Sequence, residues 1–366
     1  MTFKITTLLV CFVLCLSYNA DAQLKTPQAS PKAKVSQEVG ISHLTIKYSR
    51  PSVNDREIWG ALVPYGMNNL GFGTAKESPW RAGANENTII VFSDDAMVEG
   101  KSIKAGKYGF HIIVNEDDTA TLIFSNNNTS WGSYFYDSDE DALRVDIKTK
   151  DVLHTELLTY SFIAADANST TVSLDWEKKR FPFKIEFDVP NITLASFREQ
   201  FRGQAGFQRQ NWETAANYAL NNGGDLSEAL GWINGAIEGQ FFSQKNFNNL
   251  QIKSQILAKQ GKKSEADAIM QEALNYATIF QVHQYGRTLI ANGEKDKALE
   301  VFKMNAKNNK DTWPVHYGMA RAYSAQGNYS KALSHLTKAL NNAPNEASRG
   351  RVQANIDKLK NNQDIN

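Results

Sequence analysis

The stretch Trp80–Val114, WRAGANENTIIVFSDDAMVEGKSIKAGKYGFHIIV, predicts the fold of the first half of the chain. Its polar start leads into Asn87–Ser93, a run of β-branched and aromatic residues that is typical of a buried strand. Short acidic side chains and glycines then mark turns on both sides of a short strand at Lys101–Lys104. From Tyr108 onward every second residue is apolar, which predicts a strand with one buried face. The stretch therefore predicts part of an antiparallel sheet with one strongly apolar face.

The same alternation of apolar and polar residues continues toward Pro190. Its apolar positions are Leu143, Val145, Ile147, then Leu158, Tyr160, Phe162, then Val172, Leu174, Trp176, and finally Phe183, Ile185, Phe187 and Val189. Many short strands predict an antiparallel β-sandwich over residues 37–190, because each sheet must bury its apolar face against another. The pattern shifts by one residue near Ser42, where we expect a β-bulge.

The first 22 residues have the features of a secretory signal peptide. Lys4 gives a positive start, Leu8–Leu16 gives an apolar run, and Ala20–Ala22 gives small residues at a cleavage site. A membrane-retained helix is the alternative, but this run is too short to span a bilayer. We therefore expect an exported protein, periplasmic or secreted, with no transmembrane segment after cleavage of residues 1–22.

Cleavage would also remove both cysteines of the chain, Cys11 and Cys15. The mature protein is then expected to contain no disulfide and no cysteine ligand for a metal. The next residues, 23–36, are rich in Pro, Ser and Lys and are expected to form a flexible leader.

After Pro190 the hydrophobic period changes from two to about 3.6, which predicts helices over residues 191–366. The segment Ala322–Pro344, AYSAQGNYSKALSHLTKALNNAP, resembles a tetratricopeptide repeat, and Ala298 and Ala332 occupy the same motif position 34 residues apart. The resemblance implies about four helix pairs in a short solenoid, with residues 345–360 as a capping helix. The whole chain is thus predicted to be an α+β protein of two domains, an antiparallel β-sandwich followed by an α-helical, tetratricopeptide-like solenoid.

Four segments of the first half carry a second resemblance. They are SRPSVNDREIWGALVPYG (Ser49–Gly66), WRAGANENT (Trp80–Thr88), VEGKSIKAGKYGF (Val98–Phe110) and WGSYFYD (Trp131–Asp137). Together they are similar to a secreted bacterial family catalogued as domain-of-unknown-function family 2911, which has no assigned activity. In that family the Tyr-Gly and Trp-Arg elements lie close together, whereas residues 67–79 separate them here. This insertion is expected to change any pocket that those elements frame.

Large aromatic and directed polar side chains near the predicted strand ends are candidates for a ligand site. Trp and Arg are favoured at binding surfaces because they combine a large contact area with oriented donors. Aromatic side chains on the loops of a sandwich suit a glycan or a peptide, and an envelope component is one such ligand. The alternative is that the tryptophans close the ends of the core and that the histidine lies on the less buried face of its strand. The candidates are Trp59, Trp80, Arg81, Asn85 and His111.

The tetratricopeptide resemblance implies a protein or peptide partner, bound on the concave face by fixed positions of each repeat's first helix. Arg287 and Arg321 share one such position in successive repeats, and two guanidinium groups on one surface can bind an acidic tail or a carboxylate. The alternative is that both are ordinary solvated arginines. The full set of positions is Gln251, Gln255, His283, Arg287, Tyr317 and Arg321.

Catalytic and metal-binding motifs are missing from the sequence. It contains neither G-x-S-x-G nor H-E-x-x-H, and the acidic run Asp137–Asp141 lacks the Gly and the bidentate Glu of a calcium loop. We therefore expect no metal site and no cofactor. Lys and Arg number 40 against 39 Asp and Glu, and neither half is strongly basic, so nucleic acid is not an expected partner.

These observations favour an exported, non-enzymatic binding or scaffold protein. Its repeats would dock a protein partner, and its sandwich would bind an envelope component or another ligand. The alternative is a hydrolase acting on carbohydrate or peptide, with Glu86 and either Asp94 or Asp95 as its carboxylates. Such a pair must converge to within about 5–10 Å.

Overall fold

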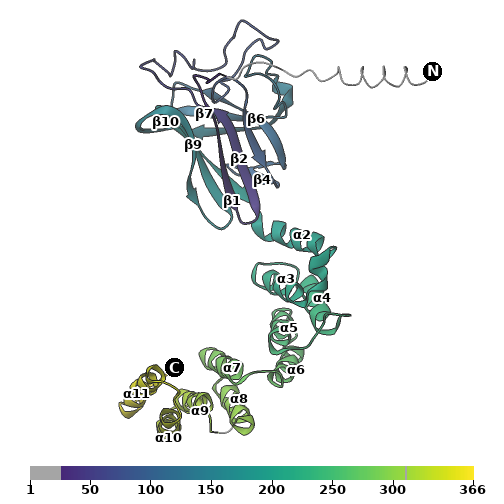
Figure 1. Ribbon diagram of the computed structural model, residues 1–366, viewed down its shortest axis with the longest axis vertical. Coiled ribbons are helices and arrows are strands. Elements are labelled where there is room, and N and C mark those ends of the chain that lie inside the picture. Colours follow the sequence, from purple (N-terminus) through teal and green to yellow (C-terminus); the bar gives the residue numbers. More distant parts are fainter. Residues whose placement is uncertain (1–25, 310) are drawn as a thin grey trace, which may run out of the picture. The chain divides into compact units, whose positions relative to one another are not determined.

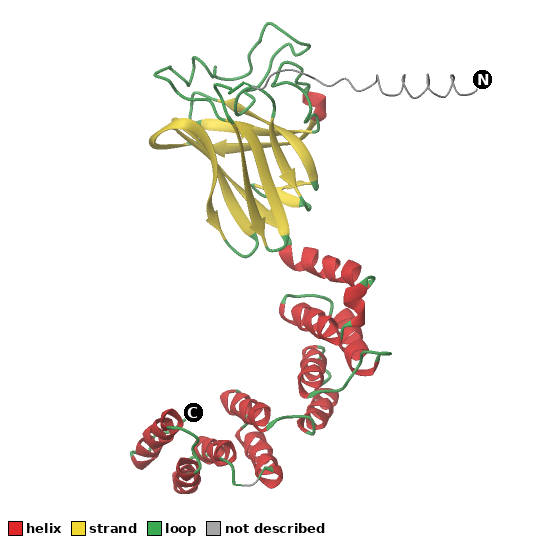
Figure 2. Cartoon of the chain, viewed as in Figure 1, coloured by secondary structure: helices red, strands yellow, loops and turns green. Residues whose placement is uncertain are grey.

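The computed structural model describes residues 26–309 and 311–366, so the predicted signal peptide at residues 1–22 lies outside the described residues. The chain divides between Ile192 and Thr193 into two compact units (Figure 1). Figure 2 shows strands in the first unit and helices in the second. The predicted α+β fold class is confirmed.

Within the described residues, the β unit consists of two antiparallel sheets (Figure 2). The larger sheet has the strand order β1-β2-β3-β6-β7-β8. Its strands are β1 (Lys32–Val39), β2 (Ser42–Ser49), β3 (Thr88–Phe92), β6 (Gly106–Val114), β7 (Thr119–Ser125) and β8 (Asp141–Lys148). The smaller sheet has the order β5-β4-β10-β9. Its strands are β4 (Ala96–Val98), β5 (Lys101–Ile103), β9 (Lys150–Ala165) and β10 (Ser169–Phe187), and a single 3₁₀ turn, η1 (Ser138–Glu140), precedes β8.

The inner faces of the two sheets share one hydrophobic core. Phe110 of β6 packs on Phe124 of β7, with ring centroids 5.1 Å apart, and on Phe183 of β10, at 5.6 Å. All three rings are fully buried, as the period-two alternation predicts for residues that face a second sheet. Tyr160 of β9 is also buried, and its hydroxyl donates a 2.9 Å hydrogen bond to the carbonyl oxygen of Ala82. The core thereby fixes the loop that carries the candidate ligand residues.

Two expectations about the start of the β unit are wrong. Residues 32–36 are not flexible, because β1 begins at Lys32 and pairs with β2, with Val35 opposite Ile46. Val35 packs against the core, and this tertiary pairing overrides a composition that is typical of a linker. The bulge expected near Ser42 is instead a two-residue turn at Gly40 and Ile41, in which Gly40 has a φ of +60°.

The second unit is built from consecutive helices that pack in pairs. Within the described residues the pairs are α3 with α4, α5 with α6, α7 with α8 and α9 with α10, and α11 packs on α10 as the predicted capping helix. The bounds are α2 (Val189–Phe201), η2 (Gln204–Phe207), α3 (Arg209–Asn221), α4 (Leu226–Glu238), α5 (Phe247–Lys259), α6 (Lys263–Leu274), α7 (Ile279–Ala291), α8 (Lys295–Asn308), α9 (Trp313–Ala325), α10 (Tyr329–Asn341) and α11 (Glu346–Lys360).

The repeat motif has a physical basis in the turns and contacts of these pairs. Gly293 and Gly327 follow α7 and α9 with φ of +82° and +77°, a conformation that ends a helix at low cost only for glycine. Ala298 and Ala332 are fully buried where paired helices approach each other. The 34-residue spacing of these residues therefore reflects one recurring helix–turn–helix unit.

Candidate functional site

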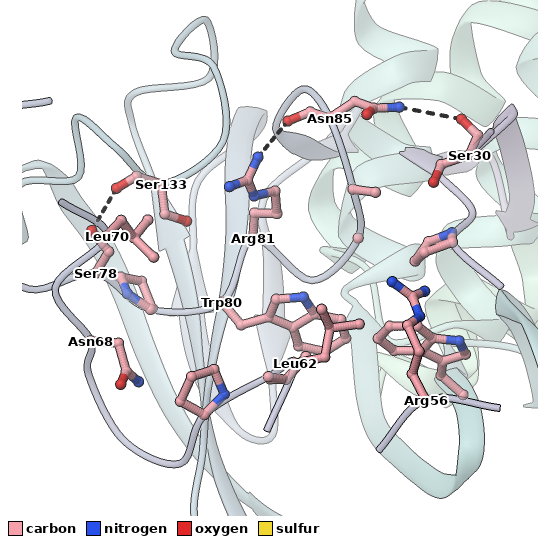
Figure 3. A pocket seen from close by; sticks show the side chains of 17 residues that line it. Ser30, Arg56, Leu62, Asn68, Leu70, Ser78, Trp80, Arg81, Asn85 and Ser133 are labelled. Atoms are coloured by element: carbon pink, nitrogen blue, oxygen red, sulfur yellow. Dashed lines mark hydrogen bonds between the residues drawn. The ribbon is translucent and has the colours of Figure 1, made fainter. Parts of the chain in front are cut away.

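A cavity of about 310 Å³ lies among the loops of the β unit (Figure 3). Three of the five candidate residues of the sandwich, Trp80, Arg81 and Asn85, line it. Arg56 from the loop after β2 and Trp176 from β10 line it as well. The WRAGAN motif therefore marks a hollow that also contains residues from distant parts of the chain.

Backbone pairing holds Trp80 beside β6. Its N–H donates to the carbonyl oxygen of Ile112 at 3.0 Å, and the N–H of Ile112 donates back at 2.8 Å. The indole stacks on that of Trp176, with centroids 5.8 Å apart and 14° between the planes. Trp59 packs edge-on against Trp80 and does not line the cavity. Both tryptophans thus pack against the core, and Trp80 in addition forms a wall of the cavity.

Arg81 is oriented by three neighbours. Its Nη1 donates to the backbone oxygen of Asn85 at 2.9 Å, and its guanidinium lies 4.9 Å from the centroid of the Tyr134 ring. Gly132, with a φ of +62°, leaves room for the guanidinium, because a Cβ atom there would collide with it. The Asn85 side chain donates in turn to the backbone oxygen of Ser30 at 3.3 Å. These contacts use only part of the five N–H donors of the guanidinium.

Arg56 is a second cation at this cavity. Its Nε donates to the backbone oxygen of Val53 at 3.0 Å, and its Nη2 donates to that of Ser52 at 2.5 Å. Figure 3 shows Arg81 above the Trp80 indole and Arg56 to the right of it. The lining residues that the structure describes include these two arginines and no Asp or Glu. The cavity therefore carries a positive potential.

His111 lies behind the cavity rather than in its wall. Its Nδ1 is 2.9 Å from the Oγ atom of Ser133, and Ser133 is the lining residue. Only 2% of His111 is exposed, so the alternative position on a less buried strand face is also wrong. The segment around Ser133 and Tyr136 covers that face of β6, and the Tyr136 ring is 5.6 Å from the imidazole. Burial, and secondarily the charge of Arg81, lower the pKa of His111 to about 4, so the ring is neutral at pH 7.

The insertion at residues 67–79 contributes lining residues that the sequence did not identify. Asn68 and Ser78 pair through two backbone hydrogen bonds of 3.0 and 2.8 Å, which close the loop at its base. The Oγ atom of Ser78 donates to the backbone oxygen of Ser133 at 2.7 Å, and Leu70 extends from the loop to the cavity. Arg56 was also missed, although it lies in the Ser49–Gly66 segment that carries the family resemblance.

The carboxylates proposed for a hydrolase do not converge. Glu86 precedes β3, whereas Asp94 and Asp95 follow it, and the five residues of β3 at 3.3 Å each separate them by about 16 Å or more. Glu86 pairs with Lys32 at 2.6 Å, and Asp95 pairs with Lys104 at 2.7 Å. A hydrogen bond from Lys32 lowers the pKa of Glu86, which is the opposite of what a general acid requires.

Four of the six candidates in the repeats meet in one groove of about 150 Å³. We call this the repeat groove; the candidates in it are His283 and Arg287 of α7 and Tyr317 and Arg321 of α9, and its further lining residues are Phe280, Trp313, Pro314 and Arg351. Gln251 and Gln255 lie on α5 and do not line it.

Stacked rings form the floor of the repeat groove. The imidazole of His283 is parallel to the ring of Tyr317, with centroids 5.8 Å apart and 3° between the planes. The guanidinium of Arg321 lies 4.9 Å from the centroid of the same tyrosine ring. Burial, followed by the charge of Arg321, lowers the pKa of His283 to about 4. The positive charge of the groove therefore comes from arginines and not from histidine.

The last residues of the chain contact the same surface of α9. Arg321 Nη1 donates to the backbone oxygen of Ile365 at 3.1 Å and to Oδ1 of Asn366 at 3.3 Å. The side chain of Asn366 donates back to the carbonyl oxygen of Arg321 at 3.0 Å. Ser324 donates to the carboxylate of Asp364 at 2.6 Å, and Ile365 is only 4% exposed. Residues 364–366, the tail segment, thus already hold one of the candidate arginines.

Comparison with known families confirms both resemblances seen in the sequence. Residues 30–185 match the model of a family described as a protein of unknown function, DUF2911, and residues 313–346 match the tetratricopeptide repeat model. Among curated proteins, none matches this sequence. The chain combines a β-sandwich of the DUF2911 type with tetratricopeptide-type helices, and such repeats indicate a protein-interaction or scaffold role.

Several solved structures resemble the helical unit at low identity. The C-terminal part of a TPR repeat-containing protein from Cytophaga hutchinsonii is 17% identical with a TM-score of 0.35, over 47% of this chain and 67% of that chain. YrrB, a TPR protein with an unusual peptide-binding site, is 18% identical with a TM-score of 0.29, over 45% and 84%. A tetratricopeptide repeat protein from Parabacteroides merdae is 16% identical with a TM-score of 0.31, over 48% and 74%. These likenesses carry no information on what this chain binds.

Proposed function

We propose that this protein is an exported, non-enzymatic binding protein. Its repeat groove docks an acidic segment of a protein partner, and its β unit binds an envelope component or another ligand. The observation that carries the proposal is the convergence of Arg287, Arg321 and Arg351 beside the stacked rings of His283 and Tyr317.

The chemistry of the repeat groove suits an acidic peptide. Arginine binds carboxylates through paired N–H groups, and among the described residues that line the groove there is no acidic side chain to neutralise the three arginines. Phe280, which is 65% exposed, and the partly buried Trp313 add apolar area at its edge. Arginine and aromatic residues side by side are typical of the energetic centre of an interface.

Contacts of the tail segment support the same role. Its backbone and amide oxygens accept hydrogen bonds from Arg321, and its Ile365 side chain is buried. The surface of α9 therefore binds a polypeptide segment through the combination of polar and apolar contacts that a partner would use.

Export rests on the signal-peptide features of residues 1–22. No helix in the described parts of the chain is both long and apolar enough to cross a membrane. Fractionation of cells that produce the chain with and without residues 1–22 tests export directly. We expect the protein outside the cytoplasm only when those residues are present, and an equal cytoplasmic distribution of both forms would contradict export.

Peptide binding tests the docking role. The probe is a fluorescent peptide of alternating Glu and Leu, compared with the peptide in which Gln replaces every Glu, on the chain that lacks residues 1–22. We expect Arg287→Ala and Arg351→Ala each to weaken binding of the acidic peptide about tenfold, because a hydrogen bond to a charged group contributes about 1.5–3 kcal/mol. Added salt should weaken it further.

Arg349→Ala is the matched control for this experiment. Arg349 lies on α11 two residues before Arg351, interacts with Glu346 and does not line the repeat groove. Its substitution should leave the affinity within about twofold, the size expected for an exposed ion pair. Equal binding of the Glu and Gln peptides, or equal losses in all three variants, would contradict the proposal.

A further inference from the structure

We infer that the cavity beside Trp80 binds a small organic acid, a molecule with an apolar or aromatic body and one carboxylate. The inference rests on the proposed ligand-binding role of the β unit and specifies the class of ligand. Three properties of the cavity support it, namely its size, its exposed apolar wall and its two arginines, which no acidic residue of the lining neutralises.

The cavity suits a small ligand with an apolar body. Its volume of about 310 Å³ is at the lower end of the range for small-molecule sites. Leu62 and Leu70 extend toward it from two different loops, with 47% and 38% of their surface exposed, and Trp80 completes this wall (Figure 3). Burying exposed apolar surface favours binding by about 25 cal/mol per Å². A ligand that covers these three side chains would therefore gain affinity from its apolar part.

The polar part of the lining includes two arginines whose N–H groups are only partly used. Arg81 uses one N–H group in the hydrogen bond to Asn85, and Arg56 uses two in bonds to backbone oxygens. The ligand is therefore expected to bring acceptors and negative charge.

A neutral sugar fits this lining less well. Serine and asparagine side chains in the wall can pair with sugar hydroxyls, but a neutral sugar does not neutralise Arg56 and Arg81. A carboxylate only accepts, and its two oxygens match the paired N–H groups of a guanidinium. The same argument favours an acid over its neutral amide.

Phenylacetate and phenylacetamide test this distinction, because they share one aromatic body and differ in charge. Each is titrated by calorimetry into the chain that lacks residues 1–22, with maltose as a neutral sugar. We expect phenylacetate to bind at least tenfold more tightly than phenylacetamide. Arg81→Lys should reduce phenylacetate affinity at least fivefold, because lysine keeps the charge but not the planar fork.

Variants at Arg56 and Leu62 separate site binding from general attraction to a charged surface. Arg56→Gln and Leu62→Asn should each weaken phenylacetate binding severalfold. Arg144→Gln is the matched control, since Arg144 lies on β8, pairs with Asp141 at 2.6 Å and does not line the cavity. Circular dichroism confirms that each variant is folded before its affinity is compared.

The possible results have distinct meanings. Phenylacetate binding that depends on Arg56 and Arg81 but not on Arg144 supports the inference. Equal affinity for the acid and the amide, or equal loss in the Arg144 control, overturns it. Binding of maltose without phenylacetate also overturns the organic-acid class, while the ligand-binding role of the β unit stands. Absence of binding by all three probes at millimolar concentration overturns the inference. The proposal for the repeat groove is unaffected, because residues of the helical unit form that groove.

Discussion

The Oγ atom of Ser133 lies 2.9 Å from Nδ1 of His111, and both side chains are buried. This contact links the cavity wall to the covered face of β6. Because the imidazole is neutral, it does not add to the positive charge of Arg81 in front of it. His111 therefore positions Ser133, and its protonation state affects the stability of the β unit.

Acid should destabilise the β unit through His111. The pKa of its side chain is about 4 in the folded protein against 6.5 for an ordinary histidine, so the unfolded chain binds the extra proton first as pH falls. The stabilisation is complete above pH 6.5 and is lost between pH 6.5 and 4, by about 3 kcal/mol at 1.36 kcal/mol per pKa unit. Hydrogen exchange at the buried amides of β6 measures the change.

The variant His111→Gln should lose less stability over this pH range, because glutamine does not titrate. His154→Gln is the control, since His154 lies on β9 with about half of its side chain exposed. Equal pH dependence in wild type and His111→Gln would show that another group causes the acid sensitivity.

Gly132→Ala should affect the ligand cavity more than the fold. A Cβ atom at Gly132 collides with the Arg81 guanidinium, and the φ of +62° strains any other residue by about 1–3 kcal/mol. We expect Arg81 to move and phenylacetate affinity to fall at least tenfold, while the β unit remains folded. Calorimetric titration and a thermal melt measure the two effects.

Gly100→Ala separates backbone strain from displacement of Arg81. Gly100 has a φ of +76° and no atom near the position of an added Cβ. Alanine at this position therefore adds backbone strain without a steric collision. Loss of phenylacetate affinity in both glycine variants would refute the role assigned to the Arg81 position.

Gly286→Ala should destabilise the helical unit. Its Cβ atom would collide with the ring of Phe302, which is fully buried between α7 and α9 and cannot move aside. Overpacking of this kind costs about 1–3 kcal/mol. Gly350→Ala in α11 has open space around the new Cβ atom and should stabilise the unit by about 0.5–1 kcal/mol. Urea unfolding measures the change in the free energy of unfolding for each variant. A change in the same direction for both variants would contradict this account of the packing.

Ile365→Ala should increase the affinity of the repeat groove for acidic peptide. Ile365 is buried on α9, and its loss weakens the tail segment that accepts hydrogen bonds from Arg321. The apparent affinity for the peptide falls as the fraction of protein with Arg321 held by the tail segment rises. Release of the tail segment should therefore raise the peptide affinity. Fluorescence titration with the Glu-Leu peptide measures the change.

Faster hydrogen exchange at the Ile365 amide, which donates to Ser324 in the structure, verifies that the segment is released. An unchanged peptide affinity despite this release would show that the segment does not compete.

Much of the fold could be predicted because its signals are local and periodic. The alternation in Trp80–Val114 and the 34-residue spacing of Ala298 and Ala332 each depend on one repeating element. The composition of residues 32–36 is typical of a linker and led to a wrong prediction of flexibility. The pairing of β1 with β2 depends on the folded sheet, and composition does not encode it.

The candidate site could be predicted in part for the same reason. Trp80, Arg81 and Asn85 lie within one motif, so their proximity follows from the sequence. Arg56 and Leu70 reach the cavity through loops whose course depends on the folded sheets. Their contribution could not be derived from residue spacing.

The paired backbone groups of Asn68 and Ser78 close the loop at residues 69–77 at its base. Because the loop is closed at its base, its tip can change in length and composition without altering the strand register of the sandwich. Exchange of residues 69–77 for loops from related sequences would replace part of the apolar wall, and through the contact of Phe72 with Tyr134 it would also change the surroundings of Arg81. Divergent evolution of ligand preference within one scaffold could proceed through this single exchangeable segment.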